Sequence, residues 1–357
     1  MGFRRNEILV NTRASESQYA RAAMGLTGLA IALFPSLPAA RAQSGQIVVW
    51  GSVPPWFVPP SGVYSTVSVG SEHALALRPD GTMVGWGGNG FGQATPQSGT
   101  FTAVAAGADH SVALRTDGTA ISWGNNFEGE TNTPPGTFLQ VSAGYHCSGG
   151  LRPDGSIVIW GLWETTPVPP GTFKSVWVGG DGNLGAIRAD NTMVTWVGAP
   201  AAISGTFKAI NVNCLAAALR ADGSVVTFGG CLSQNYPAPP GHFVQLSASS
   251  SGYHGALRPD GTIAVWGPHP PSVLNVPSGP FSFVAMGPGF GMAIKSCYVN
   301  CDNSSVSPML NANDFQCFLN KFAAGNTEAN CDGNTSGVLL TANDFQCFIN
   351  KFAAGCP

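Results

Sequence analysis

Short segments of alternating apolar and polar residues recur between residues 46 and 296, and glycine-rich turns separate them. An alternation with a period of two is typical of a β-strand that buries one face. In each repeat a second strand follows the first after a glycine-rich corner, and it ends in an aliphatic–basic pair. The pattern predicts an all-β fold made of short antiparallel strands.

A glycine two residues before an aromatic residue marks the start of each repeat. The pattern occurs seven times with a period of about 36 residues, which is typical of propellers and other repeat folds. The seven pairs are Gly62/Tyr64, Gly99/Phe101, Gly136/Phe138, Gly171/Phe173, Gly205/Phe207, Gly241/Phe243 and Gly279/Phe281.

Six repeats continue through a tight turn into a third strand. Asp-Gly and Asp-Asn tolerate positive φ, so the chain is expected to reverse there as a hairpin. The turns are Arg78-Pro79-Asp80-Gly81, Arg115-Thr116-Asp117-Gly118, Arg152-Pro153-Asp154-Gly155, Arg188-Ala189-Asp190-Asn191, Arg220-Ala221-Asp222-Gly223 and Arg258-Pro259-Asp260-Gly261. The third strands end at Trp86, Trp123, Trp160, Trp196, Phe228 and Trp266.

The seventh repeat lacks its third strand, and the N-terminal side of the chain supplies a spare one. Residues 281–295 provide two strands and then stop, whereas residues 47–51, with the sequence IVVWG, form an unpaired strand that carries the missing Trp-Gly. Joining the two removes exposed sheet edges. The sequence therefore predicts an all-β seven-bladed propeller over residues 43–296, closed by strands from both ends.

The composition agrees with a turn-rich globular protein. The 47 Gly and 27 Pro make up about 21% of the chain, against roughly 12% in ordinary proteins, and 44% of the residues are hydrophobic. The chain can bury a large core and shows no strict Gly-x-y period, so disordered and collagen-like classes are excluded.

Two segments carry the residues of a known repeat. Residues 76–81 read ALRPDG and residues 86–93 read WGGNGFGQ, and residues 113–130 repeat them closely. This pattern resembles the regulator of chromosome condensation repeat family, over residues 46–296. The short repeats and the terminal-strand closure resemble its secreted bacterial branch, which includes the type II β-lactamase inhibitor proteins.

The corners between first and second strands vary, although the repeats around them are similar. All seven corners are expected at one end of the propeller, where aromatic anchors and steering charges would form a protein-recognition face. The resemblance also implies that this end binds the target. The candidate residues are Glu72, Asp109, Tyr145, His146, Asp181, Tyr253, His254 and Phe290. Ordinary solvated loops are the alternative interpretation.

Nucleic-acid binding and catalysis are disfavoured. Residues 43–296 hold nine Lys and Arg, of which six are the turn arginines, so Lys174, Lys208 and Lys295 alone cannot make a phosphate-binding footprint. His73 and His110 occupy one repeat position beside Glu72 and Asp109. A recurring position without a nucleophile or a converging third group favours packing over acid–base chemistry, so no enzyme is expected.

Residues 1–42 resemble a secretory signal. Several Arg precede an apolar stretch from residue 22 to residue 33, and residues 40–42, ARA, match a cleavage site. A retained membrane anchor is the alternative, but the apolar run is shorter than the ~20 residues of a membrane span. We expect a secreted or cell-surface protein, a monomer, with no membrane span after cleavage.

Cysteine positions agree with export. Six of the nine Cys fall between residue 297 and the C-terminus, as in a small module held together by disulfides. In the fifth hairpin, a turn at Asp222-Gly223 would place Cys214 opposite Cys231, provided that no bulge shifts the register. A disulfide is predicted there, with Cys147 left free.

Residues 297–357 contain two copies of a loop followed by a helix, the first copy starting at Asn300 and the second at Asn330. Asn311 and Thr341 are candidate N-caps, an apolar stripe (Phe315, Phe318, Leu319 and Phe322) repeats in the second copy, and a glycine ends each helix. The two stripes can pack on each other. The duplication resembles dockerin modules, particularly those ending in Gly-Cys, and the resemblance implies a cohesin-like or cell-surface partner.

Dockerin loops hold Ca²⁺ through oxygens at EF-hand-like positions. The residues in that order are Asn300, Asp302, Ser304, Asn311 and Asp314 in the first copy and Asn330, Asp332, Asn334, Thr341 and Asp344 in the second. Each stretch is longer than the EF-hand loop of about 12 residues, and its first position is Asn, so each loop has two carboxylates and weak affinity is expected. An alternative register in the second copy begins at Asp332 and keeps the EF-hand length with Gly337 sixth, but the first copy does not fit it. The alternative is a metal-free helical pair held by disulfides, with Cys301–Cys317 and Cys331–Cys347 in the two copies and Cys297–Cys356 joining the ends.

The sequence thus predicts a secreted, non-enzymatic binding propeller that is tethered through its C-terminal module. Two alternatives stay open. The first is an inhibitor of an extracellular enzyme. The second is a carbohydrate-binding or carbohydrate-active protein, for which Trp56, Phe57 and Trp163 are the candidate exposed aromatics.

Overall fold

The fold is described from a computed structural model of the chain. It describes residues 44–162, 164–180, 183–197, 202–213, 215–229, 236–249, 251–268, 275–295, 312–323 and 341–354. Within these ranges no helix is long and apolar enough to cross a membrane.

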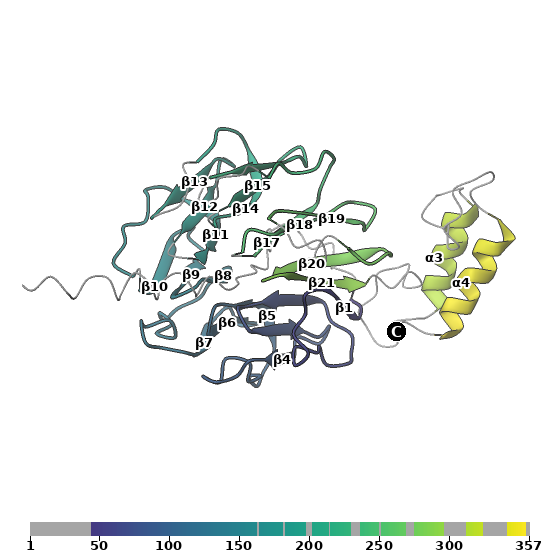
Figure 1. Cartoon of the computed structure of the whole chain (residues 1–357), viewed down its shortest axis with the longest axis horizontal. Helices are drawn as coiled ribbons and strands as arrows, with labels where there is room; N and C mark the ends of the chain where they lie inside the picture. Colours follow the sequence, from purple (N-terminus) through teal and green to yellow (C-terminus); the bar gives the residue numbers. More distant parts are fainter. Residues whose placement is uncertain are drawn as a thin grey trace, which may run out of the picture.

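The described part of the chain folds mainly into antiparallel strands that form seven three-stranded sheets (Figure 1). In chain order the strands are β1 (Ile47–Gly51), β2 (Thr66–Val69), β3 (His73–Leu77), β4 (Met83–Gly87), β5 (Phe101–Ala106), β6 (His110–Arg115), β7 (Ala120–Gly124), β8 (Gln140–Ala143), β9 (Cys147–Leu151), β10 (Ile157–Gly161), β11 (Phe173–Val178), β12 (Leu184–Arg188), β13 (Met193–Trp196), β14 (Phe207–Asn211), β15 (Ala216–Arg220), β16 (Val225–Phe228), β17 (Gln245–Ala248), β18 (His254–Leu257), β19 (Ile263–Trp266), β20 (Phe281–Gly287) and β21 (Phe290–Lys295).

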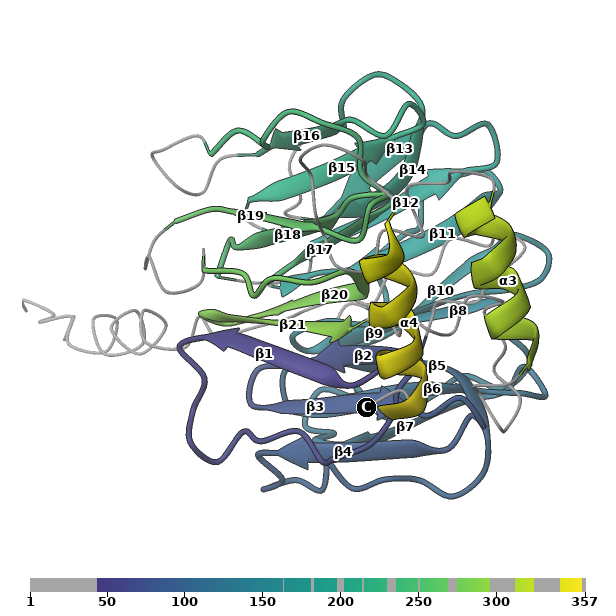
Figure 2. The same cartoon turned by 90° about the vertical axis from the view of Figure 1, so that its right-hand side faces the viewer.

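Six of these sheets take three consecutive strands, from β2-β3-β4 to β17-β18-β19. The seventh has the order β1-β21-β20, so it combines a strand from near residue 50 with two from near residue 290. Its register pairs Ile47 with Ile294 and Gly51 with Phe290. Both views place β1 beside β21 (Figures 1 and 2). This pairing is the one that the sequence predicts.

The hairpin turns follow the chemistry of their Asp and Gly. In the first, Gly81 has a φ of 84°, and Asp80 Oδ1 accepts hydrogen bonds from Thr82 N (2.9 Å) and Thr82 Oγ1 (2.7 Å). The same pair of bonds recurs in the other five turns, and Asn191, with a φ of 72°, replaces glycine in the fourth. A short polar side chain or glycine is needed there because positive φ strains other residues.

Turn arginines pack against the aromatic residue that begins their own repeat. The guanidinium carbon of Arg152 lies 4.9 Å from the centre of the Phe138 ring, and that of Arg258 lies 5.2 Å from the centre of the Phe243 ring. Two further repeats have the same cation–π contact. These arginines therefore help to hold each hairpin on its first strand.

Hydrogen bonds link the first strand of one sheet to that of the next. Ser68 Oγ on β2 accepts a hydrogen bond from Ala106 N on β5 (2.9 Å). Gln140 on β8 makes two bonds to the backbone of Val176 on β11, at 2.9 and 3.0 Å. Because these buried polar groups are satisfied between sheets, they fix the spacing of neighbouring sheets as well as filling the core.

Apolar clusters fill the spaces between sheets. One cluster joins Val67 and Val69 of β2 to Phe283 of β20 and Met292 of β21, so the last sheet packs against the first. The large side chains of this cluster are buried.

The register of the fifth hairpin differs by one residue from the alignment assumed for Cys214 and Cys231. Ala216 pairs with Phe228, whereas the assumed alignment would pair Ala216 with Gly229. Arg220 N donates a hydrogen bond to Ser224 O, so the turn between them has three residues, the third of which is Gly223 with a φ of 87°. The assumed alignment has a two-residue turn, and the extra turn residue accounts for the shift in register.

Cys214 and Cys231 themselves lie outside the described residues, so their disulfide stays a prediction. Cys147 has a free, buried thiol, as predicted, and burial raises its pKa to about 12.

The C-terminal module contains two helices, α3 (Ala312–Ala323) and α4 (Ala342–Ala354), at the predicted positions. Their aromatic stripes pack on each other: the Phe318 and Phe348 rings stack with centroids 3.9 Å apart, and Phe345 contacts Phe315 and Phe322. The two helices lie side by side in Figure 1. The predicted packing of the two stripes is confirmed.

Thr341 and Asp344 cap α4. Asp344 Oδ2 accepts a hydrogen bond from Thr341 N (2.7 Å), and Thr341 Oγ1 accepts one from Asn343 N (3.2 Å). This reciprocal arrangement is a capping box. Both residues are predicted Ca²⁺ ligands, and the cap occupies one carboxylate oxygen of Asp344.

The other predicted Ca²⁺ ligands and disulfide partners are largely outside the described residues. Asp314 belongs to α3, and the remaining ligands of both loops lie in ranges that the structure does not describe. Cys317 and Cys347 are both disulfide-bonded, and their predicted partners, Cys301 and Cys331, lie outside the described residues.

Candidate functional site

The corners and the segments that follow the third strands meet at one end of the sheets, here called the corner end. Gly88 N donates to Glu72 O (2.7 Å), Asn125 N to Asp109 O (2.9 Å), and Leu162 N to His146 O (3.0 Å). In each case a residue just after a third strand is bonded to the corner of the same sheet. The corner end therefore presents two loops from each of these sheets.

Four of the predicted recognition residues reach the surface there. Glu72 is exposed, while Asp109, Tyr145 and His146 are half-buried. Asp181 lies outside the described residues. The remaining predicted residues, Tyr253, His254 and Phe290, are at most 7% exposed and belong to the core.

The burial of Tyr253, His254 and Phe290 corrects the predicted face. Phe290 packs on Phe57, with ring centroids 5.0 Å apart, and His254 stacks on Trp266 at 5.2 Å. Because other side chains cover these rings, a partner cannot contact them; they belong to the core beneath the corner end.

A cluster of three carboxylates and a histidine lies at the corner end of the first three sheets: Glu72, Asp109, Glu130 and His146. His146 Nδ1 lies 3.5 Å from Glu130 Oε1. Burial raises the pKa of Asp109, and the negative charges of Glu72 and Glu130 add to this effect, whereas His146 opposes it. No group of His, Cys, Asp and Glu among the described residues has the arrangement of a metal site. With three carboxylates against one histidine, the cluster is a concentration of negative charge.

Two exposed aromatic residues beside this cluster are absent from the predicted recognition face. Phe91 is 48% exposed and Phe127 is 80% exposed, and their rings meet edge to face with centroids 5.8 Å apart. They lie in equivalent loops after β4 and β7. The sequence contains a signal for these two residues, because each loop has a Phe within the Asn-containing segment that follows Trp-Gly. The contact between the two rings joins different repeats, so the pattern of a single repeat does not predict it.

Other large exposed side chains concentrate at the same end. Trp56 is 55% exposed and Val58 is 68% exposed, and both follow β1; Leu162, 43% exposed, follows β10. Phe57, predicted to be exposed, is only 1% exposed. Trp163 lies outside the described residues. Clustered apolar exposure is typical of interaction surfaces.

His73 and His110 are structural. Each is fully buried, and each Nε2 lies 2.8 Å from a serine Oγ in the next sheet, Ser111 and Ser148 respectively. Burial lowers the pKa of both histidines to about 3, so both are neutral at pH 7. The expected packing and hydrogen-bonding role at the start of the second strand is confirmed.

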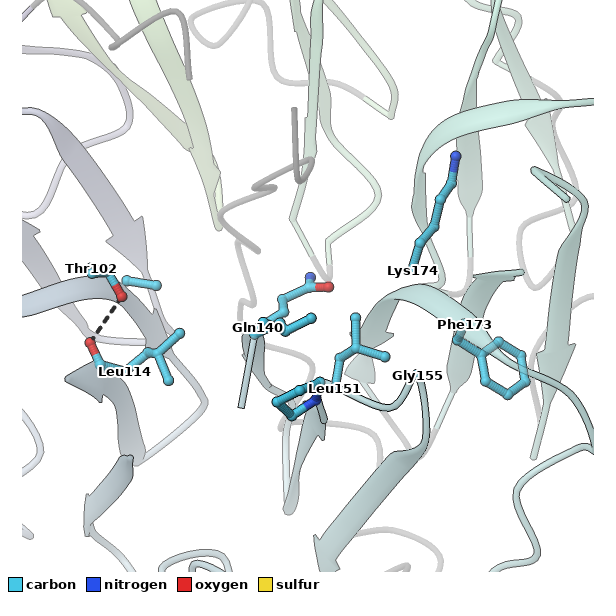
Figure 3. Close-up of a pocket in the computed structure, with 10 residues that line it drawn as sticks. Thr102, Leu114, Gln140, Leu151, Gly155, Phe173 and Lys174 are labelled. Carbon is cyan, nitrogen blue, oxygen red and sulfur yellow. Dashed lines mark hydrogen bonds between the residues drawn. The ribbon is translucent and has the colours of Figure 1, made fainter. Parts of the chain in front are cut away.

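A cavity of about 320 Å³ lies at the opposite end, between the sheets that contain β5, β8 and β11 (Figure 3). Leu114, Leu139 and Leu151 form much of its wall. Its polar side chains are already engaged: Gln140 bonds to Val176, and Lys174 to Asn191. The cavity therefore offers a mainly apolar gap between sheets, without a converging set of reactive groups.

Comparison with known families connects the first two repeats to a described motif. The regulator of chromosome condensation (RCC1) repeat model matches residues 64–93 and 101–130. These two segments contain the loops of Phe91 and Phe127. No curated protein matches the sequence.

Solved structures extend the similarity beyond these two repeats. Human WBSCR16 has 17% identity and a TM-score of 0.57, over 72% of this chain and 100% of its own. Prp20p from Saccharomyces cerevisiae has 15% identity and a TM-score of 0.56, over 84% and 97%. The ectodomain of the Arabidopsis thaliana receptor kinase ACR4 has 20% identity and a TM-score of 0.50, over 58% and 82%. The fold is that of RCC1-like propellers.

Proposed function

We propose that this chain is a secreted, non-enzymatic binding protein, in which the seven sheets form a closed propeller that recognises a protein partner through the corner end. The observation that carries the proposal is the concentration of exposed apolar side chains and carboxylates at that end. The pairing of β1 with β21 supports closure, since it joins both ends of the propeller in one sheet.

Two of the similar structures support this role. The structure of Prp20p is described together with its binding to Gsp1p and histones, so a protein with this fold binds proteins. The structure of ACR4 is an ectodomain, which agrees with a secreted position for this chain. The sequence of residues 1–42 supports secretion independently.

The C-terminal module is proposed as the anchor. Its duplicated helices, their packed aromatic stripes and its disulfide-bonded cysteines agree with a dockerin-like module that binds a cohesin-like or cell-surface partner. Calcium in its loops and the remaining disulfides are part of this proposal.

A capture experiment tests both roles. The full chain and a chain that ends at residue 296 would be used as baits for envelope and medium proteins of the producing cell, with and without Ca²⁺. We expect one partner to be lost on truncation and another to be retained. If both baits capture the same proteins, the module is not an anchor; if neither captures any, the binding role is wrong.

Carbohydrate binding is the second candidate, and the exposed Trp56 ring favours it because an exposed aromatic face can stack on a sugar. Replacing Trp56 with alanine should then abolish retention on a glycan array. Inhibition of an extracellular enzyme is the third, and it would appear as a stoichiometric complex that lowers the activity of the captured enzyme.

A further inference from the structure

Phe91 and Phe127 form an exposed aromatic pair on loops that hydrogen bonds hold in place. In the first loop, Asn89 Oδ1 accepts from Ala94 N (2.8 Å) and Gln93 Oε1 accepts from Phe91 N (2.9 Å). The rings are therefore presented by a fixed backbone, although they themselves are open to solvent.

The second loop is held in the same way. Asn126 Oδ1 accepts from Thr131 N (2.9 Å), and Asn125 Oδ1 accepts from Phe127 N (2.9 Å). A binding surface that is already ordered loses little conformational entropy when a partner docks. Two exposed rings on two ordered loops thus have the properties of a preformed anchor site.

Glu130 connects this pair to the carboxylate cluster. Its Oε2 accepts a hydrogen bond from Glu128 N (2.9 Å), one residue beyond Phe127, and its Oε1 lies 3.5 Å from His146 Nδ1. The Tyr145 ring lies against His146, with centroids 4.3 Å apart. The rings and the charges therefore belong to one surface, here called the aromatic–acidic surface: Glu72, Phe91, Asp109, Phe127, Tyr145 and His146.

The charge of this surface selects the chemistry of its partner. Glu72, Asp109 and Glu128 are accessible carboxylates, and the described corners of the first three sheets contain no Lys or Arg. Arg and Lys side chains combine an apolar stem with a cation, and they can lie on an aromatic face while pairing with a carboxylate. An acidic partner would meet like charge, which is costly in a desolvated interface.

We propose that the aromatic–acidic surface binds a protein segment in which Arg or Lys side chains alternate with aliphatic ones. The proposal rests on the proposed protein-binding function. It specifies which part of the corner end makes the contact and which class of partner binds there. The aliphatic residues would contact Phe91 and Phe127, and the basic residues would pair with Glu72 and Asp109.

Short synthetic peptides of equal length test this on the full chain. One alternates Leu and Arg, a second Leu and Glu, and a third Ser and Arg; binding is measured by fluorescence anisotropy at low and at physiological salt. We expect the Leu/Arg peptide to bind at least about tenfold more tightly than either of the others, and to weaken as salt rises.

Variants locate the binding. F91A/F127A and E72Q/D109N should each weaken binding of the Leu/Arg peptide by about tenfold or more, whereas L139A/V244A, which removes exposed side chains outside the corner end, should leave it unchanged. Circular dichroism would establish that each variant is folded. Equal binding by the Leu/Glu peptide, or unchanged binding by F91A/F127A, overturns the proposal.

The two proposals fail in different ways. If the capture experiment yields a partner whose binding is insensitive to F91A/F127A and E72Q/D109N, the binding function stands and this assignment is wrong. If no partner is captured but the peptide binds as expected, the surface has the proposed chemistry and the cellular function is wrong.

Discussion

His73, His110 and His254 are fully buried, and burial lowers the pKa of each to about 3. His73 and His110 use one ring nitrogen to bond a serine in the neighbouring sheet. Neither ring nitrogen of His254 has a hydrogen-bond partner among the described residues, and its ring stacks on Trp266. Each histidine must therefore remain neutral for the sheets to pack as they do.

These histidines make stability depend on pH. An unfolded histidine has a pKa of about 6.5, so the folded state, with its lower pKa, is favoured fully above that pH and loses stability as pH falls towards 3. When the pH is lowered from 7 to 5, protonation linked to each of these histidines should reduce the free energy of unfolding by about 2 kcal/mol. Urea unfolding at both pH values measures the sum.

His254→Phe provides the matched control. Phenylalanine keeps the stacking on Trp266 but cannot take up a proton, so the loss of stability between pH 7 and pH 5 should shrink by roughly one third relative to the native chain. An unchanged loss would mean that His254 does not titrate differently in the folded and unfolded states.

At the scale of the element, the hairpin turn is the unit that repeats. Gly118 has a φ of 85°, and a Cβ added there would meet Thr137 at an ordinary contact distance of 3.4 Å. Space is therefore available, and the backbone conformation is what restricts the residue. In the fourth turn Asn191 adopts the same conformation with a φ of 72°.

Gly118→Ala should lower the free energy of unfolding by about 1 kcal/mol, because alanine is strained at positive φ. Gly118→Asn should cost less, since the chain itself uses asparagine at this position of the turn. Thermal unfolding of the two variants measures the difference. Equal destabilisation would show that the added side chain, rather than φ, sets the cost.

Local chemistry explains which elements the sequence could predict. Each turn is specified by its own Asp and Gly, so the turns and the strands that they join could be predicted from the sequence. The strand missing near residue 295 has its counterpart at residues 47–51, so the β1–β21 pairing could be predicted as well. Phe290 was placed on the surface because its burial depends on Phe57, which belongs to a distant part of the sequence. The Phe91–Phe127 contact joins different repeats, and no pattern within one repeat contains it.

For the whole molecule, β1 occupies the position that joins the two ends of the β-sheet region. Trp50 is 6% exposed and packs in a cluster with Tyr253 and Phe281, while Ile47 and Val49 pack on the other side against the cluster of the first and last sheets. The strand therefore contributes to two apolar clusters and covers the edge of β21.

A chain that begins at Ser52 should lose these contacts and expose the edge of β21. We expect the free energy of unfolding to fall by at least about 3 kcal/mol, the usual cost of removing one buried Trp, and the protein to self-associate through the open edge. A chain that begins at Ser44 keeps β1 and is the control. Because β1 is held without a covalent link to β21, a peptide of residues 44–51 added in excess should restore the melting temperature and the monomer in size-exclusion chromatography. A Ser52 variant as stable and monomeric as the control would mean that β1 is not needed to join the ends.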